Sequence, residues 1–143
     1  MIGFHKPAIA TPDDYVFDVI DMILSSGRTS RLYKNLVIEK QIATEIGVFD
    51  APGQRYPNLF VINANPRAPH TVNEVETAIL AELERLKTEP VAERDLQRIL
   101  NKIEYDDASR MGTNGGLARN LTAYEATTGS WRYMAGYRGK VAG

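Results

Sequence analysis

The chain has 143 residues, which suits one domain, and its 43% hydrophobic and 24% charged residues exclude a disordered polypeptide. Its 17 basic and 18 acidic residues give a formal net charge of -1, so no overall positive field favours a nucleic-acid partner. The absence of cysteine excludes disulfides, thiolate metal sites and cysteine nucleophiles, and the apolar stretches are too short to span a bilayer, so we expect no membrane partner.

The first predicted helix begins at Thr11, a suitable N-cap that is followed by Pro12 at the first helical position. It runs to about Ser25. Its apolar residues recur at three- and four-residue spacing, which predicts one buried face. Gly27 ends this helix, and a second helix is predicted from about residue 29 to residue 40. Its inward side chains are Leu32, Leu36 and Val37.

From residue 42 the apolar period changes to two, which predicts a strand. Ile42, Thr44, Ile46 and Val48 alternate with Ala43, Glu45, Gly47 and Phe49, as in a strand with one better-buried face. Residues 50–57 contain Pro52 and Gly53 and are predicted to form a loop. Residues 58–65 form a second, more apolar strand, so the two strands are expected to pair as an antiparallel hairpin.

Thr71 and Glu74 have the spacing of a capping box, which predicts a helix lasting to about Lys87. Another helix begins near Ala92, and the glycines between Gly112 and Gly116 should interrupt it. Further helices are predicted for about residues 117–127 and after residue 129. The element order favours a single α+β domain over residues 1–143, with helices packed on one face of a largely antiparallel sheet.

The segment 24–44, LSSGRTSRLYKNLVIEKQIAT, contains Gly27, then Ser30-Arg31-Leu32-Tyr33, then Leu36 and Ile42-Ala43. In this order the residues resemble the second half of an insulinase/pitrilysin-type zinc metallopeptidase, whose fold is shared with mitochondrial processing peptidase. Weaker marks extend the resemblance from about Phe4 to about Gly129. It implies a first strand near residues 3–5 and a non-catalytic, C-terminal-type domain that is a fragment of a longer multi-domain chain.

Active members of this family carry H-x-x-E-H on a helix, which supplies two zinc ligands and a general base. This chain has only His5 and His70, far apart and outside that pattern. A metal site would need both histidines to meet a carboxylate such as Glu74. We instead expect His5 at a strand end and His70 beside a helix start, and we predict no catalytic residue and no metal ligand.

Some non-zinc domains of the family place a substrate-binding arginine and tyrosine at positions that correspond here to Val37 and Thr44. Valine provides neither charge nor a bidentate hydrogen bond, so that role is unavailable. Arg31 and Tyr33 are candidates for a contact with a companion domain, because both residue types are enriched at interface centres. The alternative, a local stabilising role within this domain, is favoured.

The C-terminal part is rich in aromatic residues, and a packing cluster is the favoured explanation over a ligand site. These residues are Tyr124, Trp131, Tyr133 and Tyr137.

The resemblance implies a domain that forms the wall of a peptide-degrading chamber, with no cofactor of its own. Zinc is expected in a companion domain, in the same chain or in a partner subunit, and peptide substrate would pass through the chamber. Because bacterial relatives are often exported, the resemblance favours the periplasm. The alternative is a scaffold subunit without proteolytic activity, as in the core subunits of the respiratory bc complex. A third hypothesis, an independent metal-dependent hydrolase, would require chelator-sensitive peptide cleavage by this chain alone.

Overall fold

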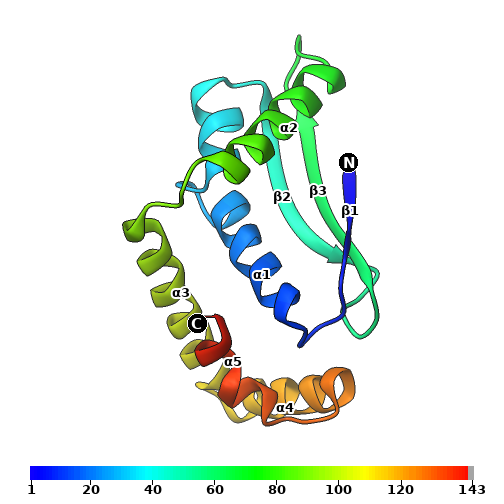
Figure 1. Cartoon of the computed structure of the whole chain (residues 1–143), viewed down its shortest axis with the longest axis vertical. Helices are drawn as coiled ribbons and strands as arrows, with labels where there is room; N and C mark the ends of the chain where they lie inside the picture. Colours follow the sequence, from blue (N-terminus) through cyan, green and yellow to red (C-terminus); the bar gives the residue numbers. More distant parts are fainter. Residues whose placement is uncertain (142–143) are drawn as a thin grey trace.

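The computed structural model describes residues 1–141, except for the side chains of residues 107 and 138. Its sheet contains β1 (Ile2–Lys6), β2 (Ala43–Ala51) and β3 (Asn58–Pro66), all antiparallel, in the order β1-β3-β2. The helical segments α1 (Pro12–Ser25), η1 (Tyr33–Glu39) and α2 (Val72–Thr88) pack beside the sheet (Figure 1). The predicted fold class, an α+β domain with helices on an antiparallel sheet, is confirmed. The first strand implied by the resemblance is also present as β1.

The remaining helices form a helical arm: α3 (Glu93–Met111), α4 (Asn114–Thr128) and α5 (Tyr133–Val141). In Figure 1, α3 lies beside α1 on the side away from the sheet, and α4 crosses below the lower end of α1. Among the described residues, no helix is both long enough and apolar enough to cross a bilayer.

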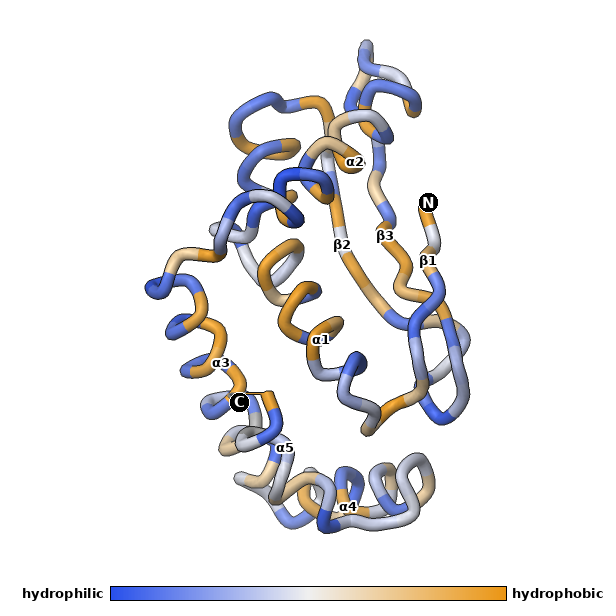
Figure 2. Tube along the Cα trace, in the orientation of Figure 1, coloured by the Kyte–Doolittle hydropathy of each residue, from blue (hydrophilic) through white to orange (hydrophobic). Residues whose placement is uncertain are grey.

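The main core lies between the sheet and the helices α1, η1 and α2. Leu32 and Leu36 are fully buried there, as the helical spacing predicts, and Val37 packs at its margin. Burying a leucine side chain contributes about 1.5–3 kcal/mol to folding. Figure 2 shows this apolar interior as orange segments along α1, β2 and β3. Its buried members are Leu24, Leu32, Leu36, Ala43, Ile46, Phe60, Ile62, Val75, Ala78 and Ile79.

The predicted alternation of β2 is wrong at its start. Ala43 pairs with Pro66 and Glu45 pairs with Asn65, which leaves Thr44 as an extra residue in a β-bulge. Because the bulge reverses the alternation, Ala43 is fully buried while Thr44 is exposed. The hydroxyl of Thr44 donates a hydrogen bond to the carbonyl oxygen of Asn65, at 3.2 Å.

The second predicted helix is present, but its turns are wider than those of an α-helix. At its end the amide of Lys40 donates to the carbonyl oxygen of Asn35, five residues earlier, at 2.8 Å. Gln41 then adopts a positive φ of 54° and directs the chain into β2. The wide turns place Leu36 in the core while Asn35 reaches α2.

The helix boundaries follow the local capping signals. The side chain of Thr71 accepts from the amide of Glu74, and the Glu74 carboxylate accepts from the amide of Thr71, so the predicted capping box is confirmed. The interruption at Gly112 is also confirmed. Helix α4 starts earlier than predicted because the Thr113 hydroxyl accepts from the amide of Gly116, at 3.0 Å.

A second, smaller core joins the helical arm to α1. Ile23 from α1 meets Ile99 and Ile103 from α3, and each is nearly inaccessible to solvent. Partly buried residues from α5, including Tyr137 and Val141, pack against this cluster. The arm is therefore attached through α1, whereas the main core lies against the sheet.

Candidate functional site

The two histidines lie at different places in the fold. His5 is in β1, opposite Leu59 of β3. His70 precedes α2, and its Nδ1 atom is 3.6 Å from the Glu74 carboxylate. That carboxylate is engaged by the backbone amide of Thr71, which is the main reason that the pKa of Glu74 is lowered. Within the described residues, no group of three or more His, Asp or Glu side chains could hold a metal ion.

Arg31 lies in a hollow of about 250 Å3 where η1 meets the end of α2. The buried carboxylate of Glu82 is central to this hollow, and it accepts hydrogen bonds from Asn35 and from Arg85, the latter at 2.8 Å. Arg85 also binds Glu89, and this contact, supported by the charge of Arg31, lowers the pKa of Glu89. Arg31 therefore contributes to the local charge balance of its own domain.

One guanidinium nitrogen of Arg31, Nη1, is buried and has no hydrogen-bond partner among the described residues. Tyr33 is partly buried and packs against the main core. Val37 packs against the same core, and Thr44 occupies the bulge of β2. Neither of the last two positions presents a charged group.

A buried ionic group, here called the Lys6 cluster, ties β1 to α1 and β2. The ammonium nitrogen of Lys6 is 2.8 Å from Asp50, 3.1 Å from Asp14 and 3.3 Å from Asp18. Lys6 is only 3% exposed and Asp14 only 2%. One cation on β1 therefore binds three carboxylates, two from α1 and one from β2.

Burial alone would lower the pKa of Lys6, but the hydrogen bond to Asp50 and the charges of Asp18 and Asp14 outweigh it. The net result is a raised pKa, so the amine stays protonated. For Asp18 burial prevails: it raises the pKa of the carboxyl group, and the hydrogen bonds from Tyr137 and Lys6 offset this only in part. A protonated amine enclosed by three acceptors cannot act as a nucleophile or base, so the cluster is structural.

Three of the four C-terminal aromatic residues pack together next to the Lys6 cluster. Tyr133 lies 5.3 Å from Tyr124 and 5.9 Å from Tyr137, measured between ring centroids, which confirms the predicted packing for these three residues. The hydroxyl of Tyr137 donates to Asp18 at 2.8 Å. Trp131 is instead 44% exposed, with the guanidinium of Arg132 over its ring.

Sequence reasoning missed the Lys6 cluster and the contribution of Tyr15, whose ring packs against Tyr133 and Tyr137. A signal was present: Asp14, Asp18 and Asp21 follow the three- and four-residue spacing of one helical face. Acids at this spacing lie on one helix face, so a single cation can pair with more than one of them. The pattern alone does not identify Lys6 as that cation.

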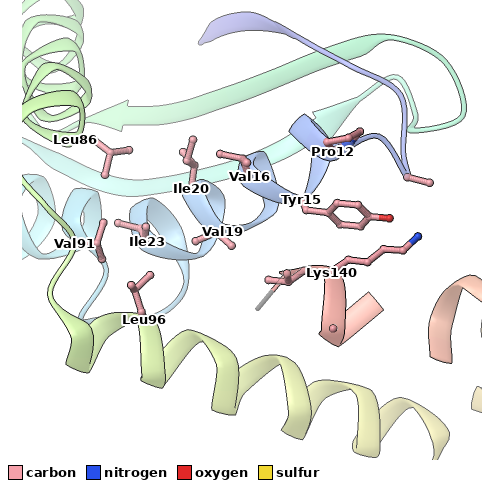
Figure 3. A pocket seen from close by; sticks show the side chains of 13 residues that line it. Pro12, Tyr15, Val16, Val19, Ile20, Ile23, Leu86, Val91, Leu96 and Lys140 are labelled. Atoms are coloured by element: carbon pink, nitrogen blue, oxygen red, sulfur yellow. The ribbon is translucent and has the colours of Figure 1, made fainter. Parts of the chain in front are cut away.

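An apolar groove of about 890 Å3 lies between α1, the end of α2, α3 and α5. Figure 3 shows Val16, Val19 and Ile20 of α1 along it, with Leu96 of α3 and Lys140 of α5 on the opposite side. Val16 is 56% exposed. Because the lining is mostly aliphatic, the groove offers apolar contact and little acid–base chemistry.

The model of one protein family, described as the peptidase M16 inactive domain, matches residues 1–103. No curated protein matches the chain. Among solved structures, the chain is similar to a protease from Helicobacter pylori, with a TM-score of 0.87 and 22% identity; the match covers 97% of this chain and 33% of the protease. The chain thus spans a third of that protein's length.

Two similar structures come from Bordetella. One is a protein of Bordetella pertussis Tohama I assigned as a zinc protease, with a TM-score of 0.83, 24% identity and coverage of 98% of this chain and 76% of that one. The other is the inactive peptidase domain of a protein of Bordetella parapertussis assigned as a zinc protease. Its TM-score is 0.84, with 24% identity and coverage of 98% and 73%. At these identities, the similarities establish a common fold.

The matched family model spans most of the chain, and the residues it covers build the entire sheet, the main core and the start of the arm. The family is defined as inactive, which implies that this chain holds no catalytic zinc. The chain therefore belongs to the peptidase M16 inactive-domain family and is a non-catalytic domain of the insulinase/pitrilysin type.

Proposed function

We propose that this domain forms part of the wall of a peptide-degrading chamber in a larger zinc metallopeptidase, beside a companion domain that carries the zinc. The observation that carries the proposal is the asymmetry of the sheet. Its helix-covered face packs into the main core, whereas Phe49 and Leu59 on the opposite face are 45% and 39% exposed. Such a face offers a rigid wall with an apolar surface for unfolded peptide segments.

Confinement would be the contribution of such a wall. An enclosed chamber keeps a peptide close to the metal and excludes folded proteins by size. The Lys6 cluster supports this role, because it fixes β1 and β2 to α1 without chemistry of its own. Zinc chemistry is assigned to the companion domain.

The open face can be tested by photo-crosslinking. A photoreactive amino acid replaces Phe49 in the parent protein, and a matched variant carries it at Leu80, which is 42% exposed on α2. We expect a peptide substrate to crosslink at Phe49 and not at Leu80. Equal crosslinking at both positions, or none at Phe49 in an active preparation, would refute the proposal that this sheet face lines the chamber.

The existence of a zinc-bearing companion domain is tested first by searching the full gene and its neighbours for an H-x-x-E-H segment. Both domains are then produced. We expect elemental analysis to find zinc in the companion and none in this domain, and cleavage of a fluorogenic peptide only when both are present. Stoichiometric zinc in this domain alone would contradict the proposal. If neither the gene nor its neighbours encode the motif, the scaffold hypothesis replaces it.

Arg31 and Tyr33 are proposed as contacts for the companion domain. Support comes from the place of Arg31 in the hollow between η1 and the end of α2, and from the enrichment of arginine and tyrosine at interface centres. Replacing either residue by alanine should weaken association by about tenfold or more in a calorimetric titration. Lys34→Ala is the matched control, because that side chain is exposed nearby. Affinities equal to that of Lys34→Ala would assign Arg31 and Tyr33 a purely local role.

A further inference from the structure

We draw no further inference here: the strongest candidate, the apolar groove of about 890 Å3 between α1, the end of α2, α3 and α5, carries nothing because no feature of the residues that the structure describes shows what covers it.

Discussion

Lys6 holds carboxylates from α1 and β2 in the interior, so its removal tests the arrangement at the scale of one residue. Lys6→Met keeps the volume of the side chain but leaves Asp14, Asp18 and Asp50 without their cation. Leaving buried charges uncompensated costs about 3–5 kcal/mol. We expect a loss of that size in the free energy of unfolding, measured by urea denaturation at pH 7.

Lys34→Met is the control for this experiment, because Lys34 is an exposed lysine paired with Glu39 and should change stability by less than about 1 kcal/mol. The difference between wild type and Lys6→Met also depends on pH. Since the folded pKa of Lys6 is raised, its contribution is complete below the ordinary value of 10.5 and is lost as the pH rises through the folded pKa. Equal stability losses for both variants would show that the cluster contributes little.

Tyr137→Phe isolates the link between the helical arm and the Lys6 cluster. It removes the hydroxyl that donates to Asp18 at 2.8 Å, a charge-assisted bond worth about 1.5–3 kcal/mol. Because this bond holds the pKa of Asp18 down against burial, the variant should raise that pKa further, as read by NMR titration. The stability loss should be greatest at neutral pH and shrink as the pH falls through the pKa of Asp18.

Tyr105→Phe serves as the control, because Tyr105 on α3 is 72% exposed. It should leave both the stability and the pKa of Asp18 unchanged. An unaltered pKa of Asp18 in Tyr137→Phe would mean that the hydrogen bond is not formed in solution.

The sequence could not identify this cluster, because its members meet only in the folded chain. Asp50 lies 44 residues from Lys6, and the register of β1 against β3 decides which face Lys6 takes. The histidines were easier to interpret, because a zinc site of this family needs a fixed local spacing that the chain lacks. The lack of a local zinc-binding motif could be predicted from the sequence, whereas the long-range ion pairs of the Lys6 cluster could not.

At the scale of elements, the break between α3 and α4 depends on a close backbone approach. A Cβ atom at Gly116 would overlap the carbonyl oxygen of Arg110, whereas one at Gly115 would meet no atom within 4 Å. Gly116→Ala should therefore destabilise the protein by about 1–3 kcal/mol through overpacking. Gly115→Ala should stabilise it by up to about 1 kcal/mol, because alanine is the better helix former.

Both variants add one methyl group to adjacent positions in the first turn of α4, so thermal denaturation compares them directly. Opposite signs are the expected result. If Gly116→Ala matched or exceeded the stability of Gly115→Ala, the turn would have to be more open than the structure shows.

Elements with strong local signals were predicted closely. Helix α1 starts after Thr11 and ends at Ser25 as expected, because Pro12 and the apolar spacing are local signals, although the side chain of Thr11 makes no capping hydrogen bond. The β-bulge at Thr44 was missed, since it is set by pairing with β3 rather than by the residues of β2. The wide turns of η1 were also missed. They accompany a contact between Asn35 and Glu82, which is 47 residues away and therefore leaves no local sequence signal.

At the scale of the whole molecule, the two cores differ in size and position. The main core binds the sheet to α1, η1 and α2, whereas the smaller core holds the helical arm through Ile23, Ile99 and Ile103. The apolar groove lies along this second contact and leaves part of it unfilled. Because close packing supplies much of the stability of an interior, the arm should be the less stable part.

Two equivalent truncations test this difference. Ile62 in β3 is fully buried in the main core, and Ile103 in α3 is 4% exposed in the smaller one. An Ile→Ala change in a core costs about 2–5 kcal/mol, and the cost depends on how well the site collapses. Ile62→Ala should lower the hydrogen-exchange protection of every element, because it weakens the unit on which global unfolding depends.

Ile103→Ala should instead accelerate exchange mainly in α3, α4 and α5, while the amides of β2 and β3 keep most of their protection. Native-state hydrogen exchange by mass spectrometry separates these patterns, because local opening exposes only the amides of the segment that opens. Uniform loss of protection in both variants would show that sheet and arm unfold as one cooperative unit. In that case the contact between α1 and α3 must be as strong as the main core, despite the groove beside it.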